Sequence, residues 1–106
     1  MAGSQYRQGD VLVVAVERLP DGLTPVARED GAVVLAHGEA TGHRHAIREP
    51  HAELLEGRGE RFLRIAGGPA RLVHEEHDPI VLPAGAYQVI RQREYQPAAW
   101  PRTVAD

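Results

Sequence analysis

Hydrophobic residues along this chain occur in short runs that glycines and prolines separate. The clearest run is Val11–Val16, which lies between Gly9 and Pro20 and is rich in β-branched side chains. It is too short for a typical helix, and a continuous apolar run of this length is typical of a strand buried on both faces. No stretch of the chain shows the periodicity of an amphipathic helix. The pattern therefore predicts strands joined by tight turns.

Turn sequences support the same interpretation. Asp30-Gly31 before Ala32–Ala36 is typical of a hairpin, and Pro83-Ala84-Gly85 predicts a tight turn before the longest strand. Residues 52–56 fit either a strand or a single helical turn. The other expected strands cover residues 25–28, 43–49, 61–65, 70–74, 80–82 and 86–95. About eight short strands between Gly/Pro turns predict an all-β fold, either a small barrel or a β-sandwich.

The length of the chain, 106 residues, predicts one domain with a single modest core. Residues 1–9 are expected to form a polar lead-in. Residues 96–106 form a C-terminal tail that contains the only tryptophan, Trp100, and we expect this tail to dock on the β domain.

Composition narrows the chemistry. The chain has no cysteine, so any transition-metal ligands must be His, Asp or Glu. It also has no lysine, which removes Schiff-base chemistry and the lysine of a phosphate-binding loop. The net charge is −3 and no basic block is present, so nucleic acid is not an expected partner. No membrane span or signal segment is recognisable, and the expected location is the cytoplasm.

Six histidines are bunched in two regions, and the first region sets His43 and His45 two residues apart, with Glu49 four residues further on. Side chains alternate between the two faces of a strand, so these three residues would share one face with Ile47. Two imidazoles and a carboxylate on one face form half of a metal site.

A second pair, His74 and His77, lies about thirty residues later in the chain. We therefore predict that a divalent ion such as Zn²⁺, Fe²⁺, Ni²⁺ or Mn²⁺ is bound by a site drawn from His43, His45, His74, His77 and Glu49. A water in an open coordination position would then activate a small substrate by Lewis-acid or hydroxide chemistry.

The first histidine region resembles the first cupin motif. That motif runs G, five residues, H-x-H, three or four residues, E, six residues, G. Here Gly38 is followed by four residues, His43-Arg44-His45, three residues, Glu49, seven residues and Gly57. The spacing of the histidines and the glutamate fits, and each glycine is displaced by one position. The resemblance implies a cupin-like barrel with a metal site.

The second cupin motif is matched only in part. Pro83-Ala84-Gly85 fits its P-x-G turn, but Gln88 stands where the family has its third histidine ligand. Three alternatives follow: Gln88 is a weak ligand, His74 or His77 substitutes for the missing histidine, or the metal site is lost.

The whole chain is also similar to a set of small uncharacterised bacterial proteins. The shared segments are a QGDV start, a GEaTGHxH segment, a HEEHxPIxLPxGxYxVxxQREY segment and a terminal VAD. They correspond here to Gln8–Val11, Gly38–His45, His74–Tyr95 and Val104–Asp106. This resemblance implies one structural unit and no particular activity.

Ordinary structural roles compete with these interpretations. His74-Glu75-Glu76-His77 has i, i+3 spacing beside Pro79, which does not fit the i, i+4 histidines of a helical zinc motif. His37 and His51 are expected at the surface. Arg91 and Arg93 share a strand face with Tyr95, and we favour a solvated face with cross-strand ion pairs over an anion- or partner-binding surface.

Three hypotheses of different classes remain. The first is a cupin-like metalloprotein. The second is a non-catalytic β-domain that binds a larger protein partner or forms a homodimer, with the histidines in a structural hydrogen-bond network. The third is a pH-responsive β-domain, because six histidines titrate near neutrality.

Overall fold

The computed structural model describes residues 3–38 and 42–92, and this part of the chain has an all-β fold, as the hydrophobic pattern predicts. The strands are β1 (Gln5–Gln8), β2 (Val11–Val16), β3 (Thr24–Pro25), β4 (Val33–His37), β5 (Arg44–Ile47), β6 (Ala52–Gly57), β7 (Glu60–Ile65), β8 (Ala70–Val73), β9 (Ile80–Leu82) and β10 (Gly85–Arg91). No helix in the described ranges has the length and apolar character needed to cross a membrane.

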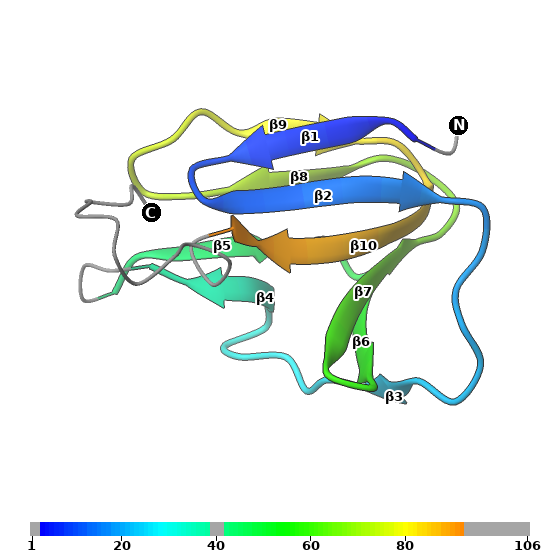
Figure 1. Ribbon diagram of the computed structural model, residues 1–106. Coiled ribbons are helices and arrows are strands. Elements are labelled where there is room, and N and C mark those ends of the chain that lie inside the picture. Colours follow the sequence, from blue (N-terminus) through cyan, green and yellow to red (C-terminus); the bar gives the residue numbers. More distant parts are fainter. Residues whose placement is uncertain (1–2, 39–41, 93–106) are drawn as a thin grey trace, which may run out of the picture.

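The strands form two antiparallel sheets (Figure 1). One sheet has six strands in the order β1-β2-β10-β7-β6-β3, and the other has four in the order β4-β5-β8-β9. The sheets do not close into a barrel, so of the two architectures expected from the sequence the sandwich is the one observed. In Figure 1, β8 and β9 of the four-stranded sheet lie behind β1 and β2, and β4 is seen below β10.

The apolar core lies between the two sheets. Val13, Leu54 and Leu63 from the six-stranded sheet belong to the same buried cluster as Ile47 and Leu72 from the four-stranded sheet. Residues of β2 alternate in burial, with Val11 and Val13 fully buried and their neighbours partly exposed. This alternation differs from the expected burial on both faces, because only one face of the sheet is covered by the other sheet.

Most of the expected strands are present, with shifted ends. Residues 52–56, left open between strand and helical turn, lie in β6, where they pair with β7. The histidine strand is shorter than expected, since β5 ends at Ile47 and leaves Glu49 outside it. The short strand expected at 25–28 is β3, at Thr24–Pro25.

One strand was missed, because β1 lies in the segment expected to be a polar lead-in. It pairs with β2 through a tight turn in which Gln8 lies opposite Val11. Gly9 has a φ of +59°, a conformation that glycine adopts without strain at the first position of a two-residue hairpin turn. Backbone pairing, rather than apolar side chains, makes this segment a strand. The tail at residues 96–106, with Trp100, lies outside the described residues.

Candidate functional site

The two histidine regions come together because β5 and β8 are neighbouring strands. Their antiparallel register places Ala46 opposite Val73 and Ile47 opposite Leu72. Continuing that register by one residue beyond β8 places His45 opposite His74, and the centroids of these two rings lie 4.3 Å apart. The H-x-H segment therefore lies against the start of the H-E-E-H segment.

Four imidazole rings make up this histidine cluster, which we define as His43, His45, His74 and His77. The ring of His74 is central, with centroids 5.4 Å from His43 in an edge-on arrangement and 4.6 Å from His77. His45 and His77 are nearly parallel, with centroids 6.1 Å apart. His45 and His74 are buried, whereas the side chain of His43 is 19 % exposed. The cluster thus runs from the core to the surface.

The tautomer of His45 is set by Gln8, which reaches it from the other sheet. The amide nitrogen of Gln8 donates to the carbonyl oxygens of Leu72, at 3.0 Å, and Asp78, at 2.9 Å. The amide oxygen of Gln8 is therefore the group that faces His45 Nδ1, at 2.8 Å. Because an amide oxygen only accepts, His45 Nδ1 carries the proton, and Nε2 of the neutral ring holds the lone pair.

Asp10 and Arg91 extend this buried network. His45 Nε2 lies 3.6 Å from Asp10 Oδ1, and Arg91 Nε donates to Asp10 Oδ2 at 3.0 Å. The side chain of Asp10 is 1 % exposed, so Arg91 compensates a carboxylate that is removed from water.

Burial keeps the ring of His45 neutral. Desolvation lowers the pKa of His45 from 6.5 to about 4, and the neighbouring His74, His77 and Arg91 act in the same direction. Asp10 opposes them, because a carboxylate favours the charged imidazolium. Desolvation prevails, so His45 is a neutral, lone-pair-bearing ligand or acceptor near pH 7.

A group with the donors of a metal site lies at the outer end of the cluster. One ligand atom from each of His43, His74 and Glu75 lies within 4.8 Å of the other two. Glu75 is exposed and follows His74 directly after β8. Glu76 also approaches, with its Oε2 3.9 Å from His43 Nε2. Two imidazoles and a carboxylate are a common donor set for first-row divalent ions.

Within this candidate metal group, hydrogen bonds to the backbone orient the side chains of His74 and Glu75. Glu75 Oε1 accepts from the backbone N–H of Arg44 at 2.9 Å. This hydrogen bond, with smaller contributions from His74 and His43, lowers the pKa of Glu75 and keeps it a carboxylate. The Nδ1 of His74 accepts from the backbone N–H of Glu76 at 3.0 Å, so the neutral ring of His74 carries its proton on Nε2.

Glu49 does not join the histidine cluster. Its carboxylate accepts from the backbone N–H of Arg71 at 3.2 Å, beyond the end of β5. Gln88, at the position where a cupin has its third histidine, donates to Glu60 Oε2 at 3.1 Å instead. Glu49 was expected among the metal ligands, and whether Gln88 is a weak ligand was left open. The structure brings together the four predicted histidines and places Glu49 and Gln88 elsewhere.

The remaining histidines have other partners. His37 is 64 % exposed and lies 3.1 Å from a carboxylate oxygen of Glu29, as expected for a surface position. His51 is half-buried, and its Nε2 lies 2.8 Å from the carbonyl oxygen of Pro69. Arg91 differs from the expected solvated strand face, because it pairs with the buried Asp10. Arg93 and Tyr95 lie outside the described residues.

Glu75, Gln8 and Asp10 were not anticipated as parts of the site. Glu75 was not named as a ligand. Gln8 was expected in the polar lead-in at residues 1–9, and Asp10, which follows that segment, was assigned no role. A sequence signal did exist for the latter pair, since two polar residues flank Gly9 immediately before the strongest apolar run. A tight turn at that glycine brings both side chains next to the core, and buried polar groups of this kind require partners.

Comparison with known proteins identifies a family without assigning an activity. Residues 7–92 match the model of a domain of unknown function, DUF8820, and the chain belongs to this family. The match spans the six-stranded and four-stranded sheets, the histidine cluster and Glu75. Comparison with curated proteins and with solved structures finds no match. The cupin resemblance gains no support from these comparisons.

Proposed function

We propose that this member of the DUF8820 family binds one divalent transition-metal ion through His43, His74 and Glu75. The observation that carries the proposal is the convergence of three ligand atoms from two neighbouring segments to within 4.8 Å of one another. All three are imidazole or carboxylate donors, and they lie where the buried cluster meets solvent.

The donor set limits the metal and the chemistry. Two histidines and one glutamate match the ligands of catalytic zinc sites and of non-haem iron sites, both of which keep open coordination positions. Water in such a position becomes acidic near neutral pH and serves as a nucleophile, while the ion polarises a substrate oxygen. The exposure of Glu75 leaves one side of the site accessible to a small molecule.

Binding an ion requires small movements. Ligand atoms around tetrahedral Zn²⁺ lie about 3.4 Å apart, given zinc–ligand bonds of about 2.0–2.1 Å. Any pair of ligand atoms that is further apart than this, up to the 4.8 Å limit, must draw inward, and the exposed Glu75 and partly exposed His43 have room to do so. The hydrogen bond from Glu76 N–H to His74 Nδ1 must also open, because it occupies the only lone pair of that neutral ring.

His45 and His77 have supporting roles in this proposal. The Nδ1 proton of His45 is held by Gln8 and its Nε2 faces Asp10, so its ring packs behind His74 without joining the three ligands. The ring of His77 also packs against the ring of His74, with centroids 4.6 Å apart. Both restrict the orientation of His74, as residues behind a metal ligand commonly do.

Metal titration of the untagged protein tests the proposal. Isothermal titration calorimetry with Zn²⁺ and Ni²⁺, with elemental analysis of the dialysed protein, should give one ion per chain. His43→Ala and Glu75→Gln should each weaken binding at least about tenfold, since each removes one of three protein ligands. His37→Ala is the matched control, because that exposed histidine lies outside the cluster, and it should bind as the unchanged protein does.

Nuclear magnetic resonance gives a second readout. The backbone amide of Glu76 should shift on metal addition, because its acceptor on His74 is taken by the ion or reoriented. Absence of a stoichiometric ion, or equal affinity in the His43→Ala and His37→Ala variants, would overturn the proposal.

The second candidate is a non-catalytic β-domain that binds a protein partner and whose histidines are structural, and the Gln8–His45 hydrogen bond supports that structural role. A buried imidazole tied to the opposite sheet stabilises the fold without any metal. This function predicts indifference to chelators together with a homodimer or a co-purifying protein partner. Sedimentation of the untagged protein with and without chelator distinguishes the two candidates.

A further inference from the structure

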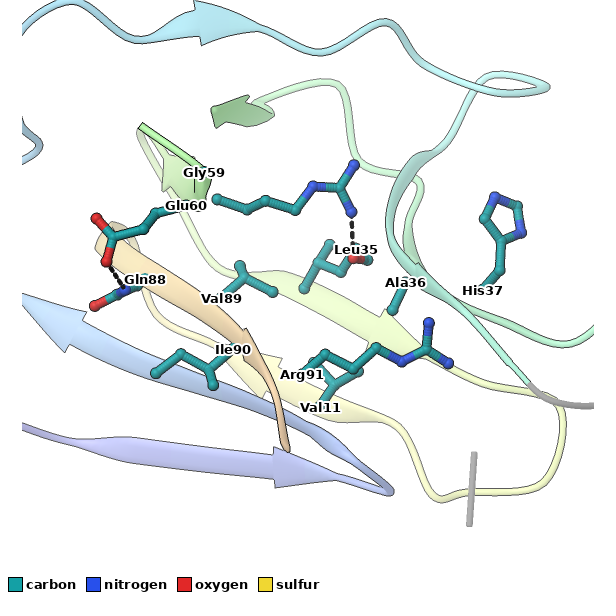
Figure 2. A pocket seen from close by; sticks show the side chains of 11 residues that line it. Val11, Leu35, Ala36, His37, Gly59, Glu60, Gln88, Val89, Ile90 and Arg91 are labelled. Atoms are coloured by element: carbon teal, nitrogen blue, oxygen red, sulfur yellow. Dashed lines mark hydrogen bonds between the residues drawn. The ribbon is translucent and has the colours of Figure 1, made fainter. Parts of the chain in front are cut away.

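A cavity of about 280 Å³ opens between the two sheets, away from His43 and Glu75. Its walls come from the end of β4, the start of β7 and the end of β10 (Figure 2). In Figure 2 the side chain of Arg91 extends from β10 toward the strand that carries Ala36 and His37. None of the proposed metal ligands lines this space.

Arg91 lines the cavity, and not all of the N–H donors of its guanidinium form hydrogen bonds with the described residues. Its Nε donates to Asp10, and its side chain is only 17 % exposed. Its terminal Nη2 is buried and forms no hydrogen bond with the residues that the structure describes. A guanidinium has five N–H donors, and a buried donor that lacks an acceptor costs free energy that an acceptor would recover.

Arg61 supplies a second guanidinium from β7. It lies opposite Val89 in the β7–β10 register, and its Nη1 donates to the carbonyl oxygen of Leu35 at 2.9 Å. That bond holds the side chain across the mouth of the sandwich. Arg61 Nε also lies 3.9 Å from Glu56 Oε1, in an ion pair between exposed side chains. A guanidinium has five N–H donors, so Arg61 can still donate to a ligand while it keeps both contacts. The sheets therefore present arginines from two adjacent strands to one small space.

The charge of the lining fits a monoanion. Among the lining residues, the two arginines stand against one glutamate, Glu60, whose carboxylate accepts from Gln88 at 3.1 Å. Glu56, outside the lining, compensates part of the charge of Arg61 from 3.9 Å. Asp10 already neutralises part of the charge of Arg91. A second negative charge on a ligand would therefore meet little uncompensated positive charge, and would be repelled by Glu60.

The rest of the lining is apolar. Val11, Leu35 and Val89 line the cavity and are buried core residues, at most 8 % exposed. A ligand that places its charge on the arginines therefore lies with its remaining atoms against hydrocarbon. The small volume excludes molecules as large as nucleotides, since ligand pockets for drug-sized molecules begin at about 300 Å³.

We propose that this cavity binds a small monocarboxylate with a hydrocarbon body, its carboxylate on Arg91 and Arg61 and its chain against Val11, Leu35 and Val89. Arginine suits this task, because its planar fork matches a carboxylate with two parallel hydrogen bonds. The proposal does not depend on metal binding.

The site is also connected to the histidine cluster. Arg91 holds Asp10, and Asp10 faces His45 Nε2 at 3.6 Å. Asp10 accepts from Arg91 Nε, so a carboxylate on the unused Nη2 would share the guanidinium with Asp10. Occupation of the cavity therefore alters the charge around His45. The resonances of the His45 ring should therefore move when a ligand binds.

The test is a nuclear magnetic resonance titration of the full chain in chelator, without metal and at low chloride. Acetate, butyrate and hexanoate are the probes, with inorganic phosphate for comparison. We expect saturable shifts at the amides of Ala36, Val89 and Arg91. Affinity should rise by about tenfold from acetate to hexanoate, because burial of about two of the four added methylenes contributes about 1.6 kcal/mol. Phosphate should give no saturable shift.

Two cavity variants and one matched control complete the design. Arg61→Gln and Arg91→Lys should each weaken hexanoate binding about tenfold, and Arg61→Gln leaves the Asp10 pair intact. Arg64→Gln is the control, since Arg64 is on the same strand but pairs with Glu53 outside the cavity. Equal binding by Arg61→Gln and Arg64→Gln, phosphate binding as tight as hexanoate, or no saturable shift with any carboxylate would overturn the proposal.

Discussion

Replacement of Gln8 by methionine tests the buried network most directly. Methionine has nearly the length and volume of glutamine, so the change removes hydrogen bonds with little change in packing. Three hydrogen bonds are lost, to the carbonyl oxygens of Leu72 and Asp78 and from His45 Nδ1. The exposed Gln5 lies on the same strand and provides the control variant Gln5→Met.

The magnitude follows from burial. The bonds to Leu72 and His45 are buried, and each contributes about 1–1.5 kcal/mol, with the lost partner left unsatisfied. The bond to Asp78 is only partly buried, and water replaces part of it. We therefore expect Gln8→Met to lower the free energy of unfolding by about 3 kcal/mol, a large share of the usual 5–15 kcal/mol.

Urea unfolding at pH 7, followed by far-ultraviolet circular dichroism, measures this difference. A loss of about 3 kcal/mol corresponds to a fall in melting temperature of about 15 °C for a chain of this size. Gln5→Met should change the free energy of unfolding by less than about 0.5 kcal/mol, because Gln5 is exposed. The nitrogen resonances of His45 should report an Nδ1 proton in the unchanged protein.

A loss below about 1 kcal/mol for Gln8→Met would refute the network as described, since two buried bonds alone exceed that value. An Nε2 proton on His45 in the unchanged protein would refute the tautomer argument independently of stability.

The other predictions concern charge and metal. Because the pKa of His45 falls from 6.5 to about 4 on folding, the unfolded chain binds more protons below pH 6.5. The metal-free protein should therefore lose about 2 kcal/mol between pH 7 and pH 5, measured by urea unfolding, and His37→Ala should leave this loss unchanged. Asp10→Asn should cost about 3–5 kcal/mol, because it leaves the partly buried Arg91 without its anion, and the double variant Asp10→Asn/Arg91→Gln should cost less than the sum of the single changes. Zn²⁺ at a hundredfold excess over its dissociation constant should stabilise the protein by about 2.7 kcal/mol in thermal unfolding, and at the same Zn²⁺ concentration the tenfold weaker His43→Ala variant should gain at most about 1.4 kcal/mol.

The fold class was predictable because strand formation here depends on local patterns. Val11–Val16 is strand β2 with the expected ends, and the Pro83-Ala84-Gly85 turn leads directly into β10, which begins at Gly85. The error at β1 shows the limit of such patterns. Residues 5–8 have no apolar periodicity, and they become a strand through backbone pairing with β2, a partner that the local sequence does not reveal.

The sequence predicted which residue types form the candidate site, but it did not predict which glutamate lies beside the histidines. Histidines at 43, 45, 74 and 77 stand out from composition and spacing. Glu49 was an equally reasonable ligand by strand alternation, but β5 ends at Ile47 and the alternation stops there. Glu75 takes the place of Glu49 in the candidate metal group because it follows His74 at the end of a neighbouring strand.

The sequence by itself determined the elements of this protein: short strands, tight Gly/Pro turns and two histidine segments. Only the tertiary structure decided which strands are neighbours. The chain between β5 and β8 forms the β6–β7 hairpin of the other sheet, so the two histidine segments meet only after the sandwich assembles. The same assembly brings Gln8 and Asp10 from the far sheet against His45. Local patterns specify which face of a strand is apolar, whereas the pairing of distant strands depends on packing the whole core.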